Sequence, residues 1–216
     1  MDFFPDPPEP ADDDAPDEHP APIWVSAPED VMPGVVPVEL ILGRSASTVV
    51  MLTGIRAFPN GLAMTLGVRV RGRVGRRDLN SEVFDGPYNH DTDPPWQANR
   101  LKWGFELADG RRVTNVDPSP WAELTQHEPS TPASPGGWLR EPEHPVLTGG
   151  GGGGGTRSVD RSFWLWPLPP AGTLRVVCQW PAQGIETTVH ELVAEPFLEA
   201  ARHAVSIWGP ATSPEQ

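Results

Sequence analysis

The sequence contains very little of several residue types, and each scarcity excludes a class of protein. Cys178 is the only cysteine among 216 residues, so an intramolecular disulfide is impossible. Lys102 is the only lysine and lies between Leu101 and Trp103, which excludes a Walker phosphate-binding loop with its Gly-Lys-Ser/Thr sequence. No run of about 18 apolar residues predicts a membrane-spanning helix, and the first residues lack the basic and apolar regions of a secretory signal. We therefore expect a cytoplasmic protein with no membrane partner.

Basic residues are also absent from the N-terminal segment, where acidic residues are concentrated. Residues 1–30 hold ten of the acids and no lysine or arginine, so the formal net charge of −13 falls to about −3 for the remaining chain. A Pro-, Asp- and Glu-rich segment buries too little apolar surface to offset its ordering entropy, which predicts a disordered acidic tail over residues 1–33. Four residues in it are exceptions that could dock on the body or on a partner: Phe3, Phe4, Ile23 and Trp24. The nearly neutral body lacks the basic face expected of a nucleic-acid-binding protein.

Proline and glycine are abundant, with 28 and 22 residues respectively, and this excludes an all-helical protein. Strict alternation of apolar and other residues over 62–71 and 101–107 predicts strands with one buried face. Hairpins are predicted at Pro59-Asn60-Gly61, where Gly61 is free to take a positive φ, and at Asp109-Gly110. About eight strands are expected: 36–44, 47–58, 62–70, 101–107, 111–116, 162–168, 173–180 and 185–193.

The C-terminal part of the chain predicts one short helix. Pro196 suits the first helical position, and a single stripe would carry Phe197, Ala201, Ala204, Val205 and Trp208. Many strands without β-α-β alternation predict an all-β, antiparallel, immunoglobulin-like β-sandwich, with a barrel as second choice. We expect one domain over residues 34–209, with long loops at 74–100 and 117–158, the second of which contains the glycine run 149–155.

Familiar catalytic and metal-binding motifs are incomplete in this sequence. His190-Glu191 resembles the start of a zinc-protease helix, but Ala194 occupies the position of the second histidine. Asp91 and Asp93 open like a calcium loop and are followed by Pro94-Pro95. Cys178, flanked by Val177 and Gln179 in a predicted strand, is expected to be a buried structural thiol. We therefore predict no catalytic residue, metal or cofactor.

Two groups of residues are candidate binding sites. In the first predicted long loop, four side chains could form a small polar ligand site: His90, Asp91, Asp93 and Trp96. At the end of the third predicted strand, five arginines could form a surface for an anionic partner: Arg69, Arg71, Arg73, Arg76 and Arg77. The alternative for the arginines is a solvated face that protects an edge strand from unwanted pairing.

Several local sequences, taken together, carry a family resemblance. They are the Leu-Ala-Asp-Gly-Arg-Arg turn at 107–112, the glycine run before a Trp-rich strand, Pro167-Leu168-Pro169-Pro170 leading to Gln179-Trp180-Pro181, and the terminal helix ending in Ile207-Trp208. On these features, residues 36–208 resemble an uncharacterised group of actinobacterial β-sandwich proteins. The resemblance implies the fold and carries no known activity.

The sequence as a whole favours binding over catalysis. We expect a non-catalytic binding or protein-interaction module that uses sandwich edges and long loops as contact surfaces. The alternative is a ligand-binding protein or enzyme whose site is built by loops 74–100 and 117–158. The oligomeric state and the identity of a protein partner are left open.

Overall fold

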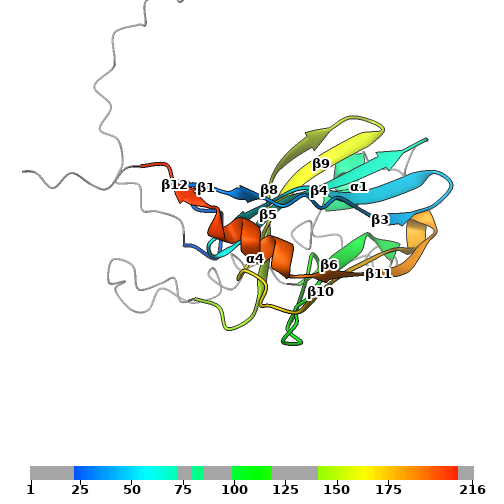
Figure 1. Ribbon diagram of the computed structural model, residues 1–216. Helices are drawn as coiled ribbons and strands as arrows, with labels where there is room; N and C mark the ends of the chain where they lie inside the picture. The colour runs from blue at the N-terminus through cyan, green and yellow to red at the C-terminus, as the bar shows by residue number, and fades with distance from the viewer. Residues whose placement is uncertain (1–21, 73–78, 85–98, 118–140, 209–216) are drawn as a thin grey trace, which may run out of the picture.

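The computed structural model describes residues 22–72, 79–84, 99–117 and 141–208 of the chain. Within these ranges antiparallel strands form two packed sheets, and a short helix lies near the C-terminal end (Figure 1). This arrangement confirms the predicted all-β antiparallel sandwich with a short C-terminal helix.

The larger sheet contains six strands. Two short strands, β2 and β3, pair with the same edge of β4. β3 pairs with the first half of β4 and β2 with its last residues, so both fit along one edge. From that edge the order is β4-β5-β9-β8. Its strands are β2 (Gly34–Val35), β3 (Leu40–Arg44), β4 (Thr48–Phe58), β5 (Gly61–Val70), β8 (Val146–Gly154) and β9 (Ser158–Trp166).

The smaller sheet has four strands in the order β11-β10-β6-β7. They are β6 (Lys102–Glu106), β7 (Arg112–Thr114), β10 (Thr173–Trp180) and β11 (Ile185–Val193). A separate two-stranded ribbon, formed by residues 31–32 and 205–206, joins the two ends of the described chain. The remaining elements are β1 (Val31–Met32), β12 (Val205–Ser206), α1 (Leu79–Phe84), the 3-10 turn η1 (Pro181–Gln183) and α4 (Glu195–Arg202).

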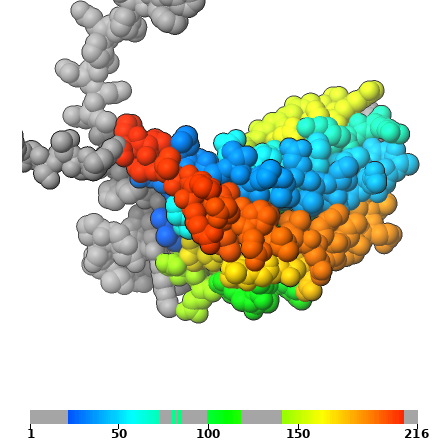
Figure 2. All heavy atoms as spheres, in the orientation of Figure 1, coloured from blue at the N-terminus to red at the C-terminus, as the bar shows by residue number. Residues whose placement is uncertain are grey.

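The core lies between the inner faces of the two sheets. The predicted alternation is confirmed in both, since every second residue of β5 from Leu62 to Val70 is buried, as are Leu101, Trp103, Phe105 and Leu107 around β6. Figure 2 shows the two layers in contact, with blue, cyan and yellow-green atoms on one side and orange and green atoms on the other. Removal of this apolar surface from water is the main force that holds the sheets together.

The two predicted hairpin turns are present, but glycine is required at one of them for a different reason from the predicted one. Gly110 has φ 84°, as expected for the Asp109-Gly110 turn. Gly61 does not take a positive φ; instead, a Cβ there would lie 2.5 Å from the Leu165 carbonyl oxygen and 2.5 Å from the Trp164 ring. Gly61 is therefore needed for close packing between β5 and β9.

Residues 22–33 differ from the tail predicted over 1–33. They carry β1 and the start of a second apolar cluster, in which Trp24 is 3% exposed. This cluster lies on the outer side of the six-stranded sheet and contains Trp24, Val25, Phe58, Val146, Trp164 and Trp166. Burial of Trp24 and Val25 and the pairing of β1 with β12 contribute to offsetting the ordering entropy of this segment. Residues 1–21 lie outside the described residues.

The glycine run was expected in a loop over 117–158, and that prediction is wrong for residues 146–154. They form β8, which pairs with β9 through a bulge between Gly149 and Gly152. In the bulge, the Gly150 carbonyl accepts a bond from Arg161 Nε and the Gly151 carbonyl accepts one from Ser162 Oγ. These bonds satisfy the backbone groups that the bulge leaves unpaired. Similarly, α1 lies within the loop predicted over 74–100.

The C-terminal helix is shorter than its apolar stripe predicted. Phe197 and Ala201 are buried on α4, which ends at Arg202, whereas Val205 belongs to β12 and Trp208 is 71% exposed. The chain leaves the helix because Val205 pairs with Met32 of β1. Val205 and Trp208 are therefore not part of a buried helical face.

Candidate interaction face

Most of the predicted site residues fall outside the described ranges. This is true of His90, Asp91, Asp93 and Trp96, and of Arg73, Arg76 and Arg77. The polar-loop site and the larger part of the arginine surface therefore stay predictions.

Arg69 lies on the outer side of β5 and is already bound within the domain. Its two terminal nitrogens each lie 2.9 Å from one carboxylate oxygen of Asp160 on β9. It also donates to the carbonyl oxygens of Val68 and Val159. The charge of Arg69 is balanced by Asp160, so the pair adds no net positive charge to the predicted arginine surface. Arg71, just beyond β5, is exposed.

Cys178 is a structural thiol, as predicted. It is fully buried on β10, and burial raises its pKa to about 12, so the reactive thiolate is scarce at neutral pH. His190 is confirmed as a strand residue of β11, with Nε2 2.9 Å from the carbonyl oxygen of Leu42 on β3. This bond joins one edge of the four-stranded sheet to the six-stranded sheet.

No group of three His, Cys, Asp or Glu side chains in the described ranges is placed to hold a metal ion. A depression of about 400 Å³ beside β2 and β4 has mainly apolar lining, to which the charged residues Glu39 and Arg56 also contribute. Its lining residues offer no nucleophile with an adjacent base.

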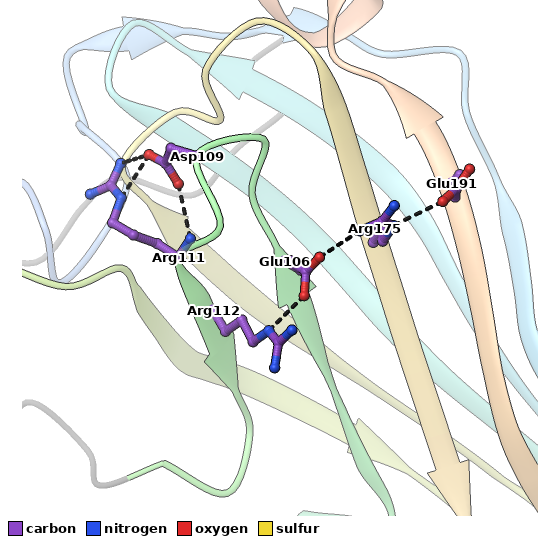
Figure 3. A network of polar contacts seen from close by, with 6 residues as sticks. All are labelled: Glu106, Asp109, Arg111, Arg112, Arg175 and Glu191. Atoms are coloured by element: carbon purple, nitrogen blue, oxygen red, sulfur yellow. Dashed lines mark hydrogen bonds and ion pairs between the residues drawn. The ribbon is translucent and has the colours of Figure 1, made fainter.

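The feature that stands out is a row of charges across the outer face of the four-stranded sheet. Each strand contributes one residue, and the order across the sheet is Glu191, Arg175, Glu106 and Arg112. We call these four residues the charged row. Figure 3 shows them in line, with each charge beside one of opposite sign.

Short contacts join every neighbouring pair of the charged row. Arg175 bridges two carboxylates, with Nε 2.8 Å from Glu191 and Nη1 2.7 Å from Glu106. The other carboxylate oxygen of Glu106 accepts a bond of 2.6 Å from Arg112 Nε. Hydrogen bonds from Arg175 and Arg112 lower the pKa of Glu106, and bonds to Glu191 and Glu106 raise the pKa of Arg175. Both shifts favour the charged forms of Glu106 and Arg175, and the formal charges of the four residues sum to zero.

Uncharged residues occupy the neighbouring positions of the same face. The next row across the sheet contains Val189, Val177, Gly104 and Thr114. Val189 is 54% exposed, and Val193, on the other side of the charged row, is 63% exposed. A face with valines on both sides of paired charges has the mixture of apolar and polar groups found in protein interfaces.

Sequence reasoning missed the charged row because its members are distant in the chain. One signal was available: a hairpin centred on Asp109-Gly110 places Glu106 opposite Arg112, as observed. Arg175 and Glu191 could be added only once β10 was known to lie between β6 and β11.

Comparisons with known proteins assign no family to this chain. No protein-family model matches the chain, and no curated protein or solved structure matches it. The resemblance to an uncharacterised actinobacterial group therefore stays a prediction. Among the described residues, no helix is long and apolar enough to cross a membrane.

Proposed function

We propose that this chain is a non-catalytic protein-interaction module whose contact surface is the outer face of the four-stranded sheet. The observation that carries the proposal is the charged row, which crosses all four strands and is bordered by the exposed Val189 and Val193. The proposal includes a protein partner in the cytoplasm and no role in nucleic-acid binding, because the body of the chain is nearly neutral.

The physical support is that this face is suited to binding without large rearrangement. Each charge of the row already has a partner at 2.6–2.8 Å, so an approaching protein meets side chains whose positions are fixed. Fixed side chains lose less entropy on binding than free ones. The exposed valines supply apolar area, and the charges supply orientation.

The proposal also includes an immunoglobulin-like assignment for the sandwich. In that fold, strands A to G form one sheet in the order A-B-E-D and another that contains G-F-C. If β4 is taken as strand A, the order β4-β5-β9-β8 corresponds to A-B-E-D and β11-β10-β6 to G-F-C, with β7 beside C. Further support comes from the buried Trp103 on the strand that corresponds to C, which pairs in register with Cys178 on the strand that corresponds to F.

The experiment is an affinity capture with the full chain as bait in an extract of its native host. The wild type is compared with Val189→Asp on the face and with Val35→Asp, the same change at an exposed valine on β2. We expect a stoichiometric partner with the wild type and Val35→Asp, and its loss with Val189→Asp. The partner is then purified and the binding repeated with isolated proteins. Equal capture by all three baits would refute the assignment of the face.

A further inference from the structure

We propose that the partner on this face is a second copy of the same chain, so that two four-stranded sheets pack face to face. The proposal rests on the proposed function of the face and names its occupant. The two-fold axis lies in the interface, parallel to the strands, and passes between β10 and β6. Closed two-fold pairing of one surface patch with itself is the commonest assembly of identical chains.

The order of charges makes the row complementary to itself. Across the sheet the signs are negative, positive, negative and positive, from Glu191 to Arg112. Rotation about the proposed axis reverses this order and keeps the row at the same height along the strands. Glu191 of each copy then faces Arg112 of the other, and Arg175 faces Glu106. All four positions meet an opposite charge, which favours this register over a sheet shifted by one strand.

The uncharged row is complementary under the same rotation. Val177 of each copy comes to lie over Gly104 of the other, which is buried with the side chain of Thr114 beside it. Val189 comes to lie over Thr114, so its exposed methyl groups meet the methyl group of a threonine. The axis that pairs opposite charges in the charged row thus also leaves no charge unpaired in the next row, where uncharged residues face uncharged residues.

Partners of a single charge sign are less well suited to this face. A basic or an acidic surface would meet two attractive and two repulsive positions along the charged row, because the row alternates and sums to zero. A partner must alternate in sign at the spacing of adjacent strands, about 4.8 Å. A second copy has this spacing by construction.

Salt dependence alone is a poor test of this pairing. Two copies carry a formal net charge of −13 each, so their long-range repulsion falls as salt is added, while attraction between the rows also weakens. The two effects have opposite signs. Exchange of charges within the row avoids this problem because it changes the sign pattern directly.

The test is sedimentation velocity on the full chain across the micromolar range, with variants at the two ends of the row. Glu191→Arg would place an arginine opposite Arg112 twice in each dimer, and Arg112→Glu would place a glutamate opposite Glu191 twice. Both side chains are largely exposed, at 61% and 75%, so the folded monomer should tolerate the changes. We expect each single variant to weaken dimerisation by at least about tenfold.

Complementation between the variants is the decisive result. An equimolar mixture of Glu191→Arg and Arg112→Glu brings opposite charges together at both ends of the row, so we expect a heterodimer. In the double variant, the arginine at position 191 of one copy faces the glutamate at position 112 of the other, so two copies should form a homodimer. The matched controls are Glu199→Arg and Arg202→Glu on α4, which make the same charge changes outside the row and should dimerise like the wild type. Thermal unfolding of each variant checks that it is folded.

Other outcomes would overturn the inference. A wild type that is monomeric throughout, single variants that dimerise like the wild type, or a mixture that stays monomeric would each do so. If the wild type is monomeric but Val189→Asp still loses a captured protein, the second-copy inference fails and the proposed function stands. If Val189→Asp keeps that protein as well, both fail.

Discussion

The two sheets have similar inner faces and very different outer faces. On the six-stranded sheet, the N-terminal segment folds back and buries Trp24 against Phe58 and Trp164, whose rings meet edge to face with centroids 5.5 Å apart. On the four-stranded sheet, the outer face carries the charged row and leaves Val189 and Val193 mostly exposed. The chain thus covers the aromatic part of one outer face, whereas the other keeps Val189 and Val193 of β11 exposed.

This difference shows how a sandwich can separate stability from recognition. Aromatic rings on an outer face require a cover, because large exposed apolar patches favour aggregation. Alternating charges and small apolar residues can stay in water at little cost and still match a complementary surface. We therefore expect changes on the first outer face to alter stability and changes on the second to alter association.

The largest effect is expected from removal of the cover. Trp24→Ala should lower the free energy of unfolding by about 3 kcal/mol, because removal of the indole ring leaves a cavity beside Phe58 and Trp164. Trp208→Ala, at a tryptophan that is 71% exposed, should change it by less than about 0.5 kcal/mol. Denaturant unfolding followed by circular dichroism measures both. Similar values for the two variants would mean that residue 24 does not contribute to a second core.

A smaller effect is expected beneath that cover, at Gly61. Gly61→Ala should destabilise the protein by about 1–3 kcal/mol, since its Cβ would meet the backbone of β9 and the ring of Trp164. Gly153→Ala on the exposed strand β8 is the matched control, because a Cβ there has no neighbour within 4 Å. That variant should be neutral or slightly more stable. Chemical denaturation of the pair measures the difference, and a destabilised Gly153→Ala would contradict the packing described for β8.

On the open face, loss of one charge should have a modest effect that depends on pH. The pKa of Glu106 is lowered in the folded state, so its contribution to stability is present above its unfolded pKa of about 4.3 and is lost as the pH falls through the folded value. Glu106→Gln should therefore be less stable than the wild type at pH 7, and the difference should shrink below pH 4. Glu186→Gln, on β11 outside the row, serves as the control. A difference for Glu106→Gln that is independent of pH would argue against the ionised row.

The smallest effect is expected at the exposed valine. Val189→Thr should change the free energy of unfolding by less than about 0.5 kcal/mol, because the added hydroxyl lies in water. Val176→Thr, on the buried side of the adjacent strand, should cost about 1–3 kcal/mol because its hydroxyl must be desolvated. Thermal unfolding of both variants compares the two faces of one sheet. Equal losses would show that Val189 is packed and not available to a partner.

The sequence predicted most strands correctly where apolar residues alternate. Leu62 to Val70 and Leu101 to Leu107 are examples, because a period of two is produced by the strand itself and needs no knowledge of its neighbours. The glycine run was misassigned for the opposite reason. Glycine has low strand propensity, and β8 exists because Arg161 and Ser162 bind its bulged carbonyls and β9 pairs with the rest.

The candidate face was much less accessible to prediction. Only Glu106 and Arg112 are linked by a local signal, the turn between them, whereas Arg175 is 63 residues beyond Arg112. The arginine surface predicted from the sequence lies elsewhere, at the end of β5. One of its members, Arg69, is paired with Asp160 on β9, and local sequence patterns do not show that β9 lies beside β5. Pairing between distant strands depends on the whole fold.

By itself, the sequence determined the all-β class, the hairpin at Asp109-Gly110, the buried thiol of Cys178 and the acidic character of the N-terminal segment. These properties follow from composition and from short-range periodicity, which act over a few residues. The tertiary structure decided the strand order, the burial of Trp24, the strand made of glycines and the charged row. Each of these depends on contacts between residues far apart in the chain, whose register is fixed only when both sheets close on a common core.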